Sequence, residues 1–95
     1  MTYKLKFHEK ALKEWKKLGT PVKEQFKKKL LERLENPHVP ADRLHGFATS
    51  LYKIKLRAAG YRLVYEVNDR EILVLVLSVG KRERDKAYIQ AQNRT

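Results

Sequence analysis

Residues 51–88 read LYKIKLRAAGYRLVYEVNDREILVLVLSVGKRERDKAY, and this stretch decides the fold. It contains three runs of strand-forming residues joined by short turns, and it ends in a cluster of cations followed by a tyrosine. In the first run, about residues 50–57, apolar side chains alternate with lysine and arginine. Alternation with a period of two predicts a strand that has one apolar face and one positively charged face.

The two later runs extend this strand into a meander. The second run, about residues 61–67, also alternates, and Gly60 before it can adopt the positive φ of a tight turn. Asn68 and Asp69 suit a two-residue hairpin turn, because both tolerate a positive φ. The third run, residues 71–79, is apolar at nearly every position, so we expect a central strand buried on both faces.

Three cations of the first two runs fall on one side of this predicted sheet. If the runs pair as a hairpin, Lys53, Lys55 and Arg62 share a face. Like charges gathered on a sheet are destabilising, so the arrangement favours an anionic partner, with a phosphodiester backbone as the leading candidate. Lysines also alternate along strands without any ligand, and at sheet edges they prevent aggregation. Spacing alone therefore leaves open catalysis, phosphate binding without chemistry, and a solvated surface.

The segment before this stretch predicts one more strand and two helices. Residues 2–7 alternate like a short strand, and residues 9–18 place apolar side chains at helical spacing. Gly19 is expected to end this helix as its C′ residue. Thr20 is expected to be the N-cap of a second helix that runs to about Asn36. The two helices form a hairpin whose apolar side should cover the sheet.

Two segments have weaker patterns. Residues 37–50 contain two prolines, a glycine and small polar residues, which predicts a loop. Residues 83–93 have moderate helix propensity but only a weak apolar stripe, so we expect the loosest helix of the fold there. The expected order is β-α-α-β-β-β-α in a single domain over residues 1–95. This is a small α+β fold with a mostly antiparallel sheet packed by a helical hairpin.

The composition limits the classes of partner. Lys and Arg number 22 against 11 Asp and Glu, so the net charge is +11 and the isoelectric point is near 10. This charge favours a polyanionic partner: nucleic acid, the ribosome, an acidic protein or an anionic membrane. The absence of cysteine excludes disulfides and zinc–thiolate sites. Because no apolar run could span a membrane or form the core of a signal peptide, we expect a soluble, intracellular protein without a membrane partner.

The cations at the end of the third run suggest a chemistry. Arg82 and Tyr88 could join the cations of the sheet face in one pocket. The chain shows no serine–histidine–acid set, carboxylate pair or phosphate-cradling glycine loop, but RNA carries its own nucleophile, the 2′-hydroxyl. Cleavage by that hydroxyl needs a proton acceptor, stabilisation of the phosphorane and a proton donor for the departing 5′-oxygen. Neighbouring cations lower the pKa of lysine and of tyrosine, so either residue type could be the acceptor.

Several segments resemble the RelE family of bacterial toxin–antitoxin toxins. They include ALKEW at residues 11–15, YKIKLR at 52–57, GYRLVY at 60–65 and SVGKRER at 78–84, and the similarity spans nearly the whole chain. The resemblance implies a compact toxin fold and an endoribonuclease that enters the ribosomal A site, cuts the messenger there and so inhibits translation.

The resemblance also implies roles for individual residues. Five residues fall on positions that the family uses for catalysis: Lys53, Lys55, Arg62, Arg82 and Tyr88. In these roles Lys55 or Tyr88 would accept the proton, and Arg82 would donate one to the leaving oxygen. Lys53 and Arg62 would stabilise the phosphorane. We further predict that five cations contact RNA or the ribosome: Lys27, Lys28, Arg43, Lys81 and Arg84.

The implied partners are the 70S ribosome with mRNA in its A site and a cognate RelB-like antitoxin that masks or displaces the C-terminal helix, all in the bacterial cytoplasm. No cofactor is expected, and His8, His38 and His45 lack the spacing of metal ligands. Two alternatives stay open. Relatives of this scaffold poison DNA gyrase without cutting RNA, and a basic RNA-binding module would show the same charge.

Overall fold

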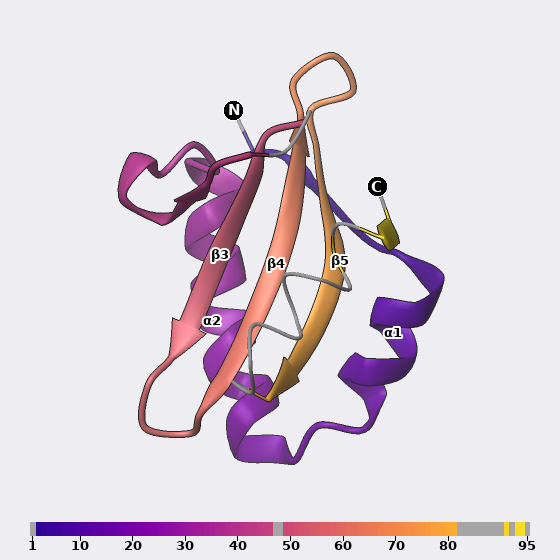
Figure 1. The fold of residues 1–95 in the computed structure, drawn as a ribbon, viewed down its shortest axis with the longest axis vertical. Coiled ribbons are helices and arrows are strands. Elements are labelled where there is room, and N and C mark those ends of the chain that lie inside the picture. The colour runs from indigo at the N-terminus through magenta and orange to yellow at the C-terminus, as the bar shows by residue number, and fades with distance from the viewer. Residues whose placement is uncertain (1, 47–48, 82–90, 92, 95) are drawn as a thin grey trace.

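The structure, a computed structural model, describes residues 2–46, 49–81, 91 and 93–94 of the chain. The elements in chain order are β1 (Lys4–Phe7), α1 (Glu9–Lys16), α2 (Thr20–Glu35), the 3-10 helix η1 (Pro40–Asp42), β2 (Arg43–Leu44), β3 (Leu51–Leu56), β4 (Tyr61–Asn68) and β5 (Leu73–Lys81). Both helices pack on a five-stranded sheet, which confirms the expected α+β class (Figure 1). The helix expected over residues 83–93 lies almost entirely outside the described residues. No helix among the described residues is long and apolar enough to cross a membrane.

The strands are ordered β1-β5-β4-β3-β2 across the sheet. The three strands from β3 to β5 form the predicted antiparallel meander. Strand β1 pairs with β5 in parallel, from Lys4 opposite Leu73 to Phe7 opposite Val76. The apolar strand β5 therefore lies between β1 and β4, as its lack of polar residues predicts. Gly60, in the β3–β4 turn, has the expected positive φ of 72°.

A β-bulge in β5 changes which of its later side chains face the helices. Val64 pairs with Ser78 and Tyr65 pairs with Val76, so Leu77 is an extra residue in the ladder. With strict alternation, Ser78 would follow Val76 onto the helix side. Leu77 alternates with Val76 and joins a second cluster on the opposite face, and the bulge then places Val79, instead of Ser78, in the core beneath the helices.

The main core lies between the sheet and the two helices. The helices contribute five buried side chains: Ala11, Trp15, Phe26, Leu30 and Leu34. These pack on the inner-facing residues of β3, β4 and β5, whereas the opposite sheet face carries a smaller cluster. In Figure 1 helix α2 lies behind the strands, so that opposite face is turned towards the viewer.

The predicted boundary between the helices was wrong by about one residue. Gly19 has φ −64° and is the N-cap of α2, so it is not a left-handed C′ residue, and Thr20 is already helical. Helix α1 instead ends in a tighter turn, in which the Lys17 and Leu18 amides bond to carbonyls three residues earlier. This ending satisfies helix carbonyls without any residue of positive φ.

The predicted two-residue turn at residues 68–69 was also wrong. Strand β5 begins only at Leu73, and the Asn68 side chain accepts a hydrogen bond of 3.1 Å from the Glu71 amide. The positive φ, 52°, falls at Ile72. The turn is longer because Asn68 folds it through its side chain.

The segment expected to be a plain loop, residues 37–50, contains η1 and β2. Arg43 pairs with Tyr52 and Leu44 with Leu51, so β2 forms a short edge strand on β3. Without β2, this side of β3 would present unpaired main-chain groups. The sequence of the segment gave no alternation long enough to reveal a strand of two residues.

The β4–β5 turn is held by a polar network around Asp69. Its carboxylate accepts a hydrogen bond of 2.7 Å from the Tyr3 hydroxyl and lies 2.8 Å from His38 Nε2. His38 Nδ1 lies 2.9 Å from the hydroxyl of Tyr52. The hydrogen bond with His38 has the largest effect on the pKa of Asp69, and the bond from Tyr3 adds to it. Together they hold this pKa below its ordinary value of 3.8.

We expect this network to stabilise the fold only above acidic pH. Because the pKa of Asp69 is lower in the folded chain, its contribution is fully present above the unfolded pKa of about 3.9 and is lost as the pH falls through the folded value. Asp69→Asn should therefore lower the urea midpoint near neutral pH, and the difference should narrow below about pH 4. Glu71→Gln, in the same exposed turn, is the control. If the urea midpoints of Asp69→Asn and wild type fall in parallel as the pH is lowered, so that their difference does not narrow, Asp69 does not have this role.

A second network ties α2 to the sheet through Tyr65. Arg33 Nη1 donates to the Tyr65 hydroxyl at 2.8 Å and to the Lys53 carbonyl at 3.3 Å, while Nη2 donates to Asp42. The Tyr65 hydroxyl donates in turn to the Pro37 carbonyl at 2.8 Å. Burial raises the pKa of Tyr65, so the phenol stays protonated and remains a donor.

Replacing Tyr65 with Phe should lower the free energy of unfolding by about 1–3 kcal/mol, because it leaves buried partners without the hydroxyl. Urea denaturation measures the change. Tyr61→Phe is the matched control, since no described residue bonds to that hydroxyl. Equal losses for the two substitutions would show that the hydroxyl of Tyr65 has no special role.

Candidate nucleic-acid interface

The register of β3 and β4 places three cations on one face of the sheet. Lys55 lies directly opposite Arg62, and Lys53 lies opposite Val64 two residues along the same strand. All three alternate with residues of the helix-side core, so they point to the face away from α2. The structure therefore brings together Lys53, Lys55 and Arg62, as the alternation predicts.

The cations occupy a rigid and partly apolar surface. Arg62 is only 8% exposed, and Lys53 and Lys55 are half-buried. The same face carries a buried cluster of Leu51, Val64, Leu77 and Ala91. Because β3 pairs with β4 over its whole length and β4 also pairs with β5, the backbone that carries the cations has a fixed register before any anion arrives. Preorganised charges of this kind stabilise a developing anion most effectively.

Among the described residues, no side chain fills the position next to Arg62 on the neighbouring strand. Gly80 of β5 lies directly opposite Arg62. Apart from Gly80 and its two chain neighbours, no atom of the described residues comes within 4 Å of the position that a side-chain Cβ would occupy there. Gly80 and Lys81 were expected to follow the last strand, but β5 extends through both. Arg82 therefore follows directly in sequence after β5, the strand that pairs with β4 beside Arg62.

Three of the predicted site residues lie outside the described part of the chain: Arg82, Arg84 and Tyr88. The residues on either side of them are placed. Lys81 ends β5 beside β4, and Ala91 is buried against Leu51, Val64 and Leu77. Both ends of the undescribed stretch 82–90 thus lie at the sheet that carries the cations.

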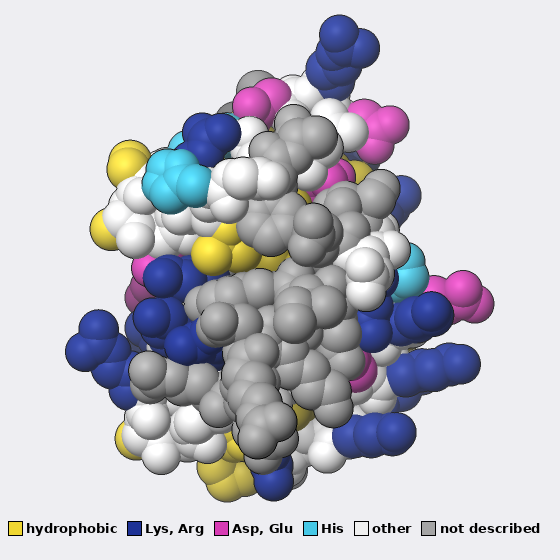
Figure 2. Space-filling view, in the orientation of Figure 1, with side chains coloured by type: hydrophobic (Ala, Val, Ile, Leu, Met, Phe, Trp, Pro, Cys, Tyr) yellow, Lys and Arg dark blue, Asp and Glu magenta, His cyan; other side chains and the backbone are white. Residues whose placement is uncertain are grey.

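The other predicted contact residues do not form one patch with this face. Lys27 and Lys28 are exposed on α2, which covers the opposite side of the sheet, and Arg43 is exposed on the edge strand β2. Figure 2 shows further Lys and Arg side chains along both sides of the face that is turned to the viewer. The positive charge therefore surrounds the molecule and is not confined to the site.

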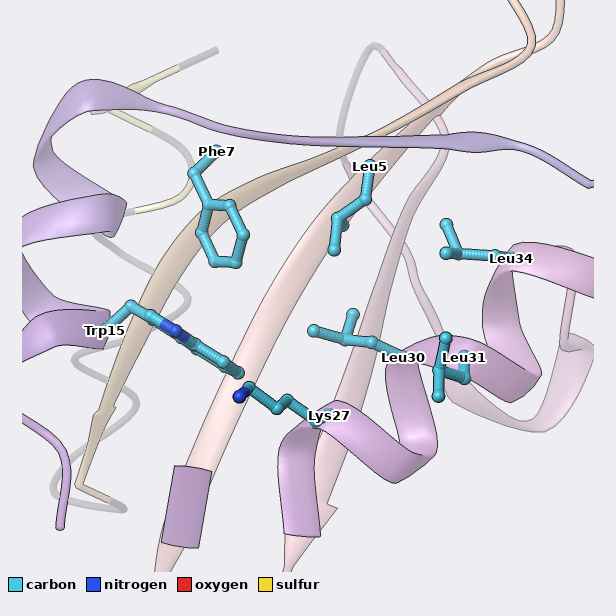
Figure 3. A pocket seen from close by; sticks show the side chains of 7 residues that line it. All are labelled: Leu5, Phe7, Trp15, Lys27, Leu30, Leu31 and Leu34. Atoms are coloured by element: carbon cyan, nitrogen blue, oxygen red, sulfur yellow. The ribbon is translucent and has the colours of Figure 1, made fainter. Parts of the chain in front are cut away.

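A groove on the helix side has a different character. It has a volume of about 260 Å³ and lies between β1, α1 and α2 (Figure 3). Its lining is apolar except for one cation: Leu5, Phe7, Trp15, Lys27, Leu30, Leu31 and Leu34. Lys27 Nζ lies 3.5 Å from Glu24 Oε1. The groove lacks the converging cations that phosphate chemistry requires, so the candidate site is the other face.

Two residues that the sequence did not single out meet beside β5. Glu14 of α1 and Arg94 form an ion pair of 2.8 Å across 80 positions of the chain. Among the described residues, no group of three or more His, Cys, Asp or Glu side chains could hold a metal ion. The described site thus consists of cations on a rigid sheet.

The fold and this cationic face define a small α+β protein suited to contact with a polyanion. The chain matches the family model of the ParE toxin of type II toxin–antitoxin systems over residues 5–86. It is also 56% identical over 94 residues to the mRNA interferase toxin RelE of Escherichia coli strain K12, covering 99% of this chain and 98% of that protein. The chain therefore belongs to the family of type II toxins that contains ParE and RelE, as the sequence resemblance implied.

Solved structures agree with this assignment. E. coli toxin RelE in the free state, with two arginines replaced by alanine, matches with a TM-score of 0.90 at 54% identity and covers 99% of this chain and 98% of that one. A chain of the intact E. coli RelBE toxin–antitoxin complex matches with a TM-score of 0.82 at 58% identity. It covers 86% of this chain and 99% of that chain.

Proposed function

We propose that this protein is the toxin of a type II toxin–antitoxin system and a metal-independent endoribonuclease that cuts mRNA in the ribosomal A site. The observation that carries the proposal is the fixed triad of Lys53, Lys55 and Arg62 on one rigid sheet face. Three cations on one sheet face suit the charge of a phosphorane. The 56% identity to a protein named mRNA interferase toxin RelE supports the choice of reaction.

The proposed reaction uses the nucleophile of the RNA itself. A base removes the proton of the ribose 2′-hydroxyl, and the 2′-oxygen forms a bond to the adjacent phosphorus. The bond from phosphorus to the 5′-oxygen then breaks, and that oxygen takes up a proton. The products are a 2′,3′-cyclic phosphate and a free 5′-hydroxyl, so no water, metal ion or other cofactor enters the balance.

Each proposed residue has one task in this reaction. Lys53 and Arg62 stabilise the phosphorane, and Arg82 donates to the leaving oxygen. Either Lys55 or Tyr88 accepts the proton, and the two residues belong to different parts of the chain. Lys55 lies beside Arg62 in the described sheet, whereas Tyr88 belongs to the stretch between Lys81 and Ala91. The further contacts proposed for Lys27, Lys28, Arg43, Lys81 and Arg84 would hold the toxin on ribosomal RNA.

The same reasoning assigns partners and a compartment. A net charge of +11 suits the 70S ribosome with mRNA in its A site. The second partner is a cognate antitoxin, in keeping with the RelBE complex that contains a matching chain. Because both proposed partners act in the bacterial cytoplasm, we propose that the protein inhibits translation there.

Replacing Arg82 with Ala should abolish cleavage of the messenger, because the leaving oxygen loses its donor and the phosphorane loses a charge. The loss of one such donor costs about 10²–10³ in rate. Primer extension on messenger translated in vitro measures scission, and circular dichroism checks the fold. Arg70→Ala, which removes an exposed arginine in the β4–β5 turn, is the charge-matched control.

Three outcomes separate the proposal from its alternatives. An Arg82→Ala protein that still cuts the messenger contradicts the assigned role of Arg82. A wild-type protein that arrests growth and leaves ribosome-bound message intact indicates a gyrase poison. Salt-sensitive RNA binding without scission at any concentration of toxin indicates a plain RNA-binding module.

The identity of the base should appear in the pH dependence. Single-turnover cleavage should become faster with rising pH until the base is deprotonated. Of Lys55→Ala and Tyr88→Ala, the substitution that removes the base should abolish this rise and slow cleavage by about 10²–10⁴. The other should slow cleavage but retain the rise. If both variants keep the rise, neither residue is the base.

A further inference from the structure

The edge strand β1 places two lysines on the sheet face that carries the cationic triad. Leu5 and Phe7 point from β1 towards the helices and line the apolar groove (Figure 3). Because side chains alternate along a strand, Lys4 and Lys6 point to the opposite face. Both lysines are exposed, so this face of the sheet carries a second group of cations at its β1 edge.

The two lysines line a hollow beside the β4–β5 turn. The hollow has a volume of about 390 Å³, and its lining consists of Lys4, Lys6, Glu71 and Leu73. Leu73 lies directly opposite Lys4 in the ladder between β1 and β5. The lining therefore combines two positive charges with one negative charge and an apolar floor.

A strained residue shapes one side of this hollow. Ile72 lies between the lining residues Glu71 and Leu73 and has a φ of 52°. A positive φ is a genuine outlier for a β-branched residue, and such strain is concentrated at binding and catalytic sites. The Ile72 carbonyl accepts a hydrogen bond of 2.8 Å from the Lys4 amide, which ties the turn to β1 at the first of the two lysines.

Neither lysine has an acidic partner within the described part of the chain. The ion pairs there join other residues, and no carboxylate lies within 4.0 Å of either ammonium group. Like charges on one sheet face reduce stability, and an anion bound between Lys4 and Lys6 would offset that cost. Lysines on an edge strand also discourage pairing with another chain, which is the competing explanation for this pair.

A neutral and acidic strip separates the hollow from the cationic triad. Lys6 lies opposite Leu75, and Leu75 lies opposite Glu66 of β4. Glu66 in turn lies opposite Leu51 of β3. Three strand spacings of about 4.8 Å put β1 about 14 Å from β3. Because an RNA strand that ran from the triad to β1 would have to cross Glu66, the two groups of cations suit two separate backbones.

We propose that Lys4 and Lys6 bind the phosphodiester backbone of ribosomal RNA at a place separate from the site of cleavage. The inference rests on the proposed nuclease function, which takes the protein to the ribosome. Charge complementarity supports it, because an ammonium group is a compact point charge that suits a phosphate oxygen. Contacts of this kind fix the orientation of a protein on RNA and carry no sequence preference.

Replacing both lysines with glutamine should weaken binding to vacant 70S ribosomes. Each lost phosphate contact lowers the slope of log affinity against log salt concentration by about 0.7–0.9. The double variant Lys4→Gln/Lys6→Gln should therefore lower this slope by about 1.4–1.8, and the affinity at about 0.1 M salt should fall at least about tenfold. Cosedimentation across a salt series measures both quantities, and the urea midpoint checks the fold.

Three further variants separate a local contact from net charge. Lys13→Gln/Lys16→Gln removes the same charge from two exposed positions of α1, which packs on the helix side of the sheet, and should change affinity and slope much less. Lys4→Arg/Lys6→Arg keeps the charge and should bind within about twofold of wild type. Glu71→Gln removes the acid that lines the hollow and should bind more tightly than wild type.

Cleavage kinetics give a second readout. The variant Lys4→Gln/Lys6→Gln should keep the single-turnover rate at saturating ribosomes within about twofold of wild type, because the hollow is remote from the triad. The ribosome concentration that gives half-maximal rate should rise by the factor measured for binding. A fall in the saturating rate would place the lysines in the chemical step and overturn their assignment as a separate binding contact.

The remaining outcomes also decide the inference. Unchanged affinity and slope would overturn it, and so would equal losses in the β1 and α1 double variants. Aggregation of the β1 variant in size-exclusion chromatography, with affinity unchanged, would show that the lysines only protect the edge strand. Affinity lost only when message is present would assign them to the messenger and overturn the choice of ribosomal RNA. Failure of the nuclease proposal appears differently, as message left uncut by the wild-type protein.

Discussion

The antiparallel register of β3, β4 and β5 is the constraint on which the molecule depends. Side chains alternate between the two faces of a strand, so a slip of one residue would turn Lys53, Lys55 and Arg62 into the core beneath α2. The same slip would expose the apolar residues that hold the helices. Burial of one face therefore fixes the position of the charges on the other, and the stability of the fold and the geometry of the site have one origin.

The bulge at Leu77 changes the alternation of β5. It places Val79, instead of Ser78, in the main core with Val76, and it leaves Gly80 beside Arg62. The cationic face then has an apolar half, which packs Ala91, and a charged half. Gathering like charges reduces stability, and the cost is acceptable where an anion binds or reacts.

Contacts between distant segments complete the structure where the sheet ends. Arg33 joins α2 to the carbonyl of Lys53 and to Tyr65, and Asp69 joins the β4–β5 turn to Tyr3 and His38. The Glu14–Arg94 pair has the same role at the end of β5. In each case a side chain satisfies polar groups that no strand or helix reaches.

The sequence by itself determined the meander, the helical hairpin, the central place of β5 and the shared face of the three cations. These features follow from local periodicity, because the spacing of apolar residues along a segment indicates which side chains are buried and which are exposed. It did not determine the helix caps at residues 19–20, the longer turn after Asn68, or the short strand β2, because competing local hydrogen bonds decide them. The bulge and the Glu14–Arg94 contact were decided only by the tertiary structure, since they depend on the pairing of β4 with β5 and on residues 80 positions apart.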